Sequence, residues 1–193
     1  IAQCLVGSEM CIRDRAMDNF INRTEDEEPV RKDLREINFL SGKVTDYLIR
    51  LSEEDMSHND ELTVSSLYKV LGDIMRVADF SNNIMRYLRV AVANELYFSS
   101  EGLNEIKEMY SLVDELFKDV DYTFANRTTR LLAKIEDTES KTDKFKLQLQ
   151  QNHLDRLKGG NCKSESSSLY VNLIGNIERV ADHLVYIAQS VKE

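Results

Sequence analysis

The stretch Gly72-Asp73-Ile74-Met75-Arg76-Val77-Ala78-Asp79 returns later in the chain as Gly175-Asn176-Ile177-Glu178-Arg179-Val180-Ala181-Asp182. The two copies share the tetrapeptide Arg-Val-Ala-Asp and lie 103 residues apart, more than half of the 193-residue chain. Each copy continues to an isoleucine five positions further on, Ile84 and Ile187. Similarity within one chain at a long, fixed distance indicates a duplicated supersecondary unit. We therefore expect two related halves.

Around both copies, apolar residues recur every three or four positions, which is the period of an amphipathic helix. Such stripes cover residues 34–51, 67–92, 103–117, 131–157 and 173–191. One proline and seven glycines leave few breaks in the chain, and no segment shows the alternation of a strand. Because long helices must bury their apolar stripes on one another, the sequence predicts an all-α helical bundle.

The first 15 residues differ from the rest, because they show no clean helical stripe. They do not fit a signal peptide, since their apolar part is short and no basic region precedes it. They also resemble a translated sequencing-adaptor string. We interpret residues 1–15 as a non-native start, residues 16–98 as a first repeat that lacks its opening helix, and residues 99–193 as a second, complete repeat.

The composition limits the classes of binding partner and the cellular compartment that fit this chain. The formal net charge is −9 and no basic stripe is present, so the sequence predicts no nucleic-acid partner and favours cations as ligands. No apolar run reaches the ~18 residues that a membrane span needs. The chain has three cysteines, Cys4, Cys11 and Cys162. This small, odd number provides no disulfide framework and fits a reducing compartment. We expect Cys162 to be an unpaired surface thiol.

Two acid pairs stand out in the second half. Glu178 and Asp182 are four residues apart and share one helical face, and Glu139 and Asp143 repeat this spacing on the preceding helix. Two antiparallel helices could bring the four carboxylates together as a site for Mg, Mn, Ca or Fe. The alternative is a solvated or salt-bridged face, because 34 acidic residues make such spacings common.

The first half carries a degenerate version of this pattern. Asp79 returns as the last acid of the motif, but Met75 stands where the second copy has its glutamate. Leu34 and Asn38 stand where the partner helix of the second copy has its acid pair. The expected metal chemistry therefore rests mainly on the second half.

The sequence motifs of several known kinds of catalytic site are missing from the chain. A di-iron oxidase bundle needs Glu-x-x-His on two helices, and none of the three histidines has a glutamate three positions earlier. No Gly-rich phosphate loop follows a strand, and Gly159-Gly160 is better interpreted as a helix end. No nucleophile with a nearby base can be identified, so we expect that the protein is not an enzyme.

Three stretches resemble the PhoU family: residues 153–162 (HLDRLKGGNC), residues 176–188 (NIERVADHLVYIA) and, at the start of the second half, residues 97–105 (YFSSEGLNE). The likeness spans about Val30 to the end and is greatest to the PhoU-like domain at the cytoplasmic end of bacterial sodium/phosphate cotransporters. It implies a bundle of two three-helix repeats.

The resemblance also implies a site. In the family, Glu/Asp-x-x-x-Asp motifs bind multinuclear metal clusters, so divalent or iron-type ions held by carboxylates are the implied cofactors. Tyr186 stands where the family often has asparagine. The implied metal ligands are Glu178 and Asp182 on the last helix, Glu139 and Asp143 on the helix before it, and Asp79 and Asp73 in the first repeat.

The family regulates phosphate uptake. We therefore expect a metal-binding regulatory domain of a sodium-dependent phosphate cotransporter, at the cytoplasmic face of the plasma membrane. Its partner would be the membrane transport domain or a phosphate-signalling protein, and a homodimer is left open. The alternatives are a free-standing phosphate-uptake regulator and a metal-free helical interaction module.

Overall fold

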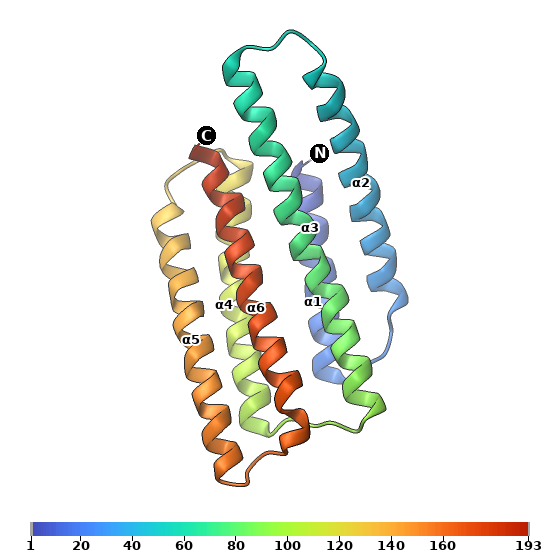
Figure 1. Ribbon diagram of the computed structural model, residues 1–193, viewed down its shortest axis with the longest axis vertical. Helices are drawn as coiled ribbons and strands as arrows, with labels where there is room; N and C mark the ends of the chain where they lie inside the picture. The colour runs from blue at the N-terminus through green and yellow to red at the C-terminus, as the bar shows by residue number, and fades with distance from the viewer. Residues whose placement is uncertain (1, 193) are drawn as a thin grey trace.

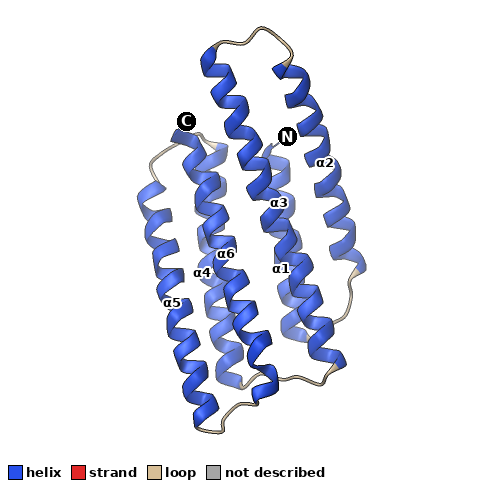
Figure 2. Ribbon diagram, viewed as in Figure 1, coloured by secondary structure: helices blue, strands red, loops and turns tan. Residues whose placement is uncertain are grey.

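The computed structural model describes the backbone of residues 2–192 and the side chains of residues 12–192. Within that range the chain forms six long helices and two short 3-10 helices, without a strand, so the all-α prediction is confirmed (Figure 2). The helices are α1 (Ala2–Asn22), α2 (Glu28–Ser52), α3 (His58–Ala93), α4 (Ser100–Ala125), α5 (Leu132–Lys158) and α6 (Ser167–Gln189), and the 3-10 helices are η1 (Ser164–Ser166) and η2 (Ser190–Lys192).

The helices form two groups of three that lie side by side (Figure 1). Helices α1 to α3 make the first group and α4 to α6 the second. Helices α3 and α6, which carry the duplicated motif, run antiparallel and pack against each other at the centre. Helices α2 and α5 lie at the two outer edges, and the hairpin of α2 and α3 extends beyond the other helices. The two helices that carry the duplicated motif therefore form the contact between the two halves, which we call the α3–α6 seam.

Local sequence fixes several helix ends. Ser57 accepts a hydrogen bond from the backbone N–H of Asp60, whose carboxylate bonds back to Ser57, a capping box that starts α3. Ser99 caps α4 by accepting from the N–H of Gly102 at 3.1 Å, as its sequence context predicts. Helix α5 ends at Lys158, and Gly160 follows with φ of +70°, a conformation that side chains disfavour.

The apolar residues of the duplicated motif are buried in both copies. Ile74 and Ile177 are each 0% exposed. Burying one such side chain contributes about 1.5–3 kcal/mol. The valines and alanines of the shared tetrapeptide are buried as well. The motif is therefore a packing motif first, and only its polar positions are available for function.

The structure differs from the sequence analysis at the start of the chain. It forms α1 where an opening helix was expected to be absent, so the first half also has three helices. Ile12, Ala16 and Met17 are buried in the core, and the guanidinium of Arg13 bonds to Asp114 at 2.7 Å. The non-native origin of residues 1–15 stays a prediction.

The structure also bears on the expectations for the cysteines and for a membrane span. The side chains of Cys4 and Cys11 lie outside the described residues, and Cys162 is a half-buried free thiol. Within the described part of the chain, no helix is both long enough and apolar enough to span a membrane.

Candidate metal centre

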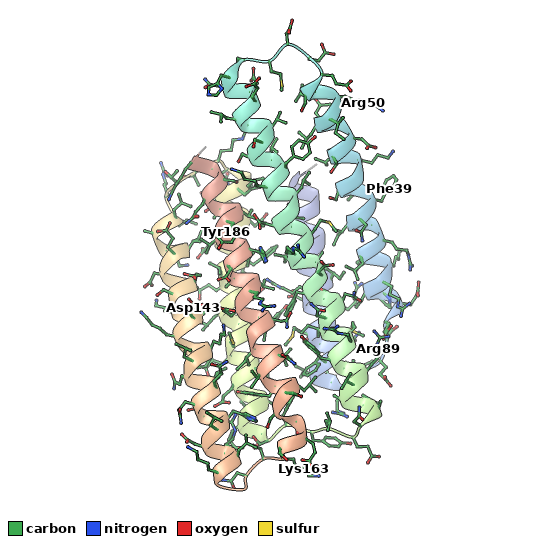
Figure 3. All side chains as sticks on the ribbon, viewed as in Figure 1. Phe39, Arg50, Arg89, Asp143, Lys163 and Tyr186 are labelled. Atoms are coloured by element: carbon green, nitrogen blue, oxygen red, sulfur yellow. The ribbon has the colours of Figure 1, made fainter. Side chains whose placement is uncertain are left out.

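Three of the expected carboxylates meet between α5 and α6. Glu139 and Asp143 lie one turn apart on α5, and Asp182 faces them from α6. One oxygen of each lies within 4.8 Å of the others. Figure 3 labels Asp143 on α5, the helix at the outer edge of the second half. The grouping exists because α5 and α6 pack together and each presents acids at a helical spacing.

The cluster is electrostatically strained without a cation. Burial raises the pKa of Glu139, and the charges of Asp143 and Asp182 raise it further. Burial also raises the pKa of Asp182, followed by the charges of Glu178 and Asp143. Because both groups resist ionisation beside one another, a cation placed among them would be stabilised by the same charges.

The atoms available to a ligand fit a hard metal ion. Asp143 Oδ1 is buried and has no hydrogen-bond partner, which is costly for a carboxylate oxygen. The donor set of three carboxylates is of the type that Mg, Mn, Ca and Fe accept. A buried carboxylate oxygen without a partner, on a residue of the cluster, is what an ion would satisfy.

The fourth expected ligand, Glu178, is engaged by a lysine. Its Oε1 lies 2.8 Å from Nζ of Lys146, and both side chains are largely buried. Sequence reasoning missed Lys146, although it lies three residues after Asp143 and so on the same face of α5. The structure therefore brings together three free carboxylates and one that a lysine already neutralises.

The first-half candidates lie outside this group. Asp79 is exposed on α3, and Asp73 bonds to His183 of α6 through Oδ1 and Nδ1 at 2.9 Å. Asn38 donates to the backbone carbonyl of Leu34 at 2.8 Å. Among the described residues, the α5–α6 cluster is the one group of three or more acids, histidines or cysteines with ligand spacing. The first half thus shows the degeneration that its sequence indicates.

The strain in the cluster predicts a stabilising substitution. We expect Asp182→Asn to raise the free energy of unfolding of chelated protein at neutral pH by about 0.5 kcal/mol. The first reason is that an ionised group no longer has to be buried, and the second is that repulsion from Glu178 and Asp143 is removed. The pKa of Asp182 is raised in the folded state, so its ionisation destabilises the fold above that pKa. The gain should therefore shrink as the pH falls through the folded pKa toward the ordinary value of 3.8. Thermal unfolding followed by circular dichroism measures it.

A control with the opposite expected change in stability lies on α5. The hydrogen bond from Lys141 lowers the pKa of Asp137, so Asp137→Asn should lower stability at neutral pH instead. If both variants shift stability in the same direction, the proposed repulsion within the cluster is wrong.

Comparison with known proteins agrees with this architecture. The family model of the PhoU domain matches residues 106–191. The phosphate-specific transport system accessory protein PhoU homolog 1 of Thermotoga maritima is 22% identical over 128 residues, which are 66% of this chain and 54% of that protein. The putative inorganic phosphate export protein YjbB of Escherichia coli O157:H7 is 24% identical over 176 residues, which are 86% of this chain and 31% of that protein.

The chain thus spans about half of the first relative and about a third of the second. The crystal structure of PhoU from Pseudomonas aeruginosa superimposes with a TM-score of 0.78 at 16% identity, over 98% of this chain and 93% of that one. Both halves therefore have the fold of PhoU, and the stretch that the PhoU domain model matches includes α5, α6 and the three carboxylates.

Proposed function

We propose that this protein is a PhoU-like regulatory domain of phosphate transport that holds a metal ion between α5 and α6. One observation carries the proposal: the matched PhoU domain contains both helices that bring Glu139, Asp143 and Asp182 together. The names of the relatives support the phosphate context, because one is an accessory protein of phosphate-specific transport and the other a putative phosphate exporter.

The proposed role of the metal is regulatory. Glu139 and Asp143 would hold the ion from α5, and Asp182 would hold it from α6. A bound cation supplies the positive charge that three converging carboxylates lack. These residues join the two helices through the ion, so occupancy would change how firmly α5 is held against α6. We propose this in place of a catalytic role.

We further propose that the domain acts at the cytoplasmic face of the membrane with a phosphate transport domain. The likeness to YjbB supports this, since most of this chain corresponds to under a third of that putative exporter. The likeness to PhoU supports the alternative of a free-standing regulator. The gene sequence upstream of residue 16 tests the two. Apolar segments of about 20 residues there would support a transporter, and a nearby start codon would support the free regulator.

Metal binding can be tested on the unmodified chain. We expect a metal ion to co-purify when chelators are omitted, and Mn²⁺ added to chelated protein to raise its melting temperature. At 100 times the dissociation constant, the free energy of unfolding should rise by about 2.7 kcal/mol. Elemental analysis and thermal unfolding measure the two effects. Protein that carries no metal and does not respond to Mn²⁺ or Fe²⁺ would favour the metal-free interaction module.

A further inference from the structure

An open groove of about 520 Å³ lies between α3 and α6. Lys69, Asp73 and Arg76 line it from α3, and His183 and Tyr186 line it from α6. Its volume falls within the range of ~300–1,000 Å³ that is typical of small-molecule sites. None of its lining residues belongs to the carboxylate cluster. The groove is therefore a second, separate candidate site.

The charges in the groove favour an anion, although the chain as a whole carries −9. Among the described residues that line the groove, Lys69 and Arg76 are the cationic ones and Asp73 is the acidic one, and the carboxylate of Asp73 accepts a hydrogen bond from His183 at 2.9 Å. Arg76 forms no ion pair with any residue that the structure describes. A guanidinium at the wall of a groove is well suited to bind an oxyanion such as phosphate through two parallel hydrogen bonds.

The duplication provides a comparison within the molecule. At the position 103 residues before His183 stands Phe80, and at the position before Ser190 stands Tyr87. Phe80 and Tyr87 are 3% and 8% exposed, so buried aromatic rings stand at the corresponding positions of α3, and the hydroxyl of Tyr87 bonds to Asn176 of α6. His183 and Ser190 are smaller. The groove is therefore lined by the smaller side chain at each of these two pairs of positions.

The polar side chains at corresponding positions also differ between the two sides of the α3–α6 seam. Asn176 and Asn83 occupy the positions that correspond to Asp73 and Tyr186. Asn176 donates to the hydroxyl of Tyr87 at 2.6 Å and accepts from Asn83 at 3.3 Å. On that side the polar side chains satisfy one another across the seam. On the groove side, Tyr186 is 55% exposed.

An aromatic surface lies beside the positive charges. The ring of Tyr186 meets that of His183 edge to face, with centroids 6.2 Å apart and planes at 74°. The faces of an exposed tyrosine ring can stack on a planar ring of a ligand, whereas Arg76 attracts an anionic group. The volume leaves room for more than a bare phosphate ion.

We propose that the groove binds a small phosphate ester with a planar ring, of the type of a nucleoside monophosphate. The phosphate lies against Arg76 and Lys69, and the ring packs on Tyr186. The proposal does not depend on the metal site, since the two sites share no residue.

Calorimetric titration of the full chain tests the proposal in the presence of a chelator, so that no metal bridges the ligand. The probes are AMP, inorganic phosphate and adenosine. We expect AMP to bind, phosphate to bind more weakly, and adenosine to bind at least about tenfold more weakly than AMP. Arg76→Gln should weaken AMP binding roughly tenfold or more, because a charge-assisted hydrogen bond is lost. Tyr186→Ala should weaken AMP roughly tenfold and leave phosphate unchanged.

Arg179→Gln is the matched control, because Arg179 is the exposed counterpart of Arg76 in the second copy of the motif and lies outside the groove. It should bind AMP like the unmodified chain. The proposal is overturned if the unmodified chain ignores AMP at millimolar concentration, or if Arg76→Gln binds AMP unchanged. Retention on phosphatidylglycerol vesicles that depends on Arg76, without AMP binding, would also overturn it, because the phosphate source would then be a lipid headgroup.

Discussion

Replacing Arg13 with alanine is expected to lower the free energy of unfolding by about 3 kcal/mol. Arg13 is 0% exposed, and its guanidinium bonds to Asp114 at 2.7 Å and to the hydroxyl of Tyr110 at 3.0 Å. It also lies 4.6 Å from the centroid of Phe117. Removing one partner of a buried ion pair usually costs about 3–5 kcal/mol. We expect the lower value because Lys118 still lies 2.7 Å from Asp114.

Arg15→Ala is the matched control on the same helix. Arg15 is 42% exposed and pairs with Asp33 at the surface, so its loss should cost about 1 kcal/mol or less. Urea unfolding followed by circular dichroism measures both variants. Equal, small effects would show that α1 is not docked on α4 as described, and would support a non-native start.

Replacing Asp143 and Asp182 together with asparagine is expected to weaken Mn²⁺ or Fe²⁺ binding by about 100-fold or more. The variant keeps the shapes of both side chains but removes two of the three charges in the cluster. Changes to groups that merely surround a metal ligand already cost about 10–100-fold in affinity. Titration of chelated protein, with elemental analysis of the variant as purified, measures the loss.

Asp79→Asn provides the control for the metal experiment. Asp79 has the same sequence context as Asp182 but is exposed on α3 and lies outside the cluster. Its substitution should leave metal affinity unchanged. If Asp79→Asn weakens binding as much as the double variant does, the ion is held elsewhere. Asp182→Asn should also stabilise the chelated protein, so loss of metal cannot be attributed to unfolding.

The helices could be predicted from sequence because their signals are local. Ser99 before α4 and Gly160 after α5 are capping residues whose effect depends on neighbouring residues only. Helix α1 was missed although Ile12, Ala16 and Phe20 follow a four-residue spacing and are all buried. This helical spacing is present in the sequence, but the resemblance of residues 1–15 to a translated adaptor string favoured a non-native start over a helix.

From the sequence, only the acid pairs on each single helix of the candidate metal site could be predicted. The pairs Glu139 with Asp143 and Glu178 with Asp182 follow from the spacing of residues on one face. The convergence of the two helices depends on tertiary packing, which the sequence suggested only through antiparallel neighbours. The pairing of Asp73 with His183 joins residues 110 positions apart, and no local pattern predicts it.

The contact between Lys146 and Glu178 has a consequence for the charge of any metal ion that the proposed site would hold. With Glu178 balanced by the lysine at 2.8 Å, the charge left to a metal is that of the three grouped carboxylates. A trivalent ion would neutralise them fully, whereas a divalent ion would balance only two and leave the third to keep a proton or remain charged. An ion of higher positive charge held by Glu139, Asp143 and Asp182 would therefore meet a closer charge balance there than a divalent ion would.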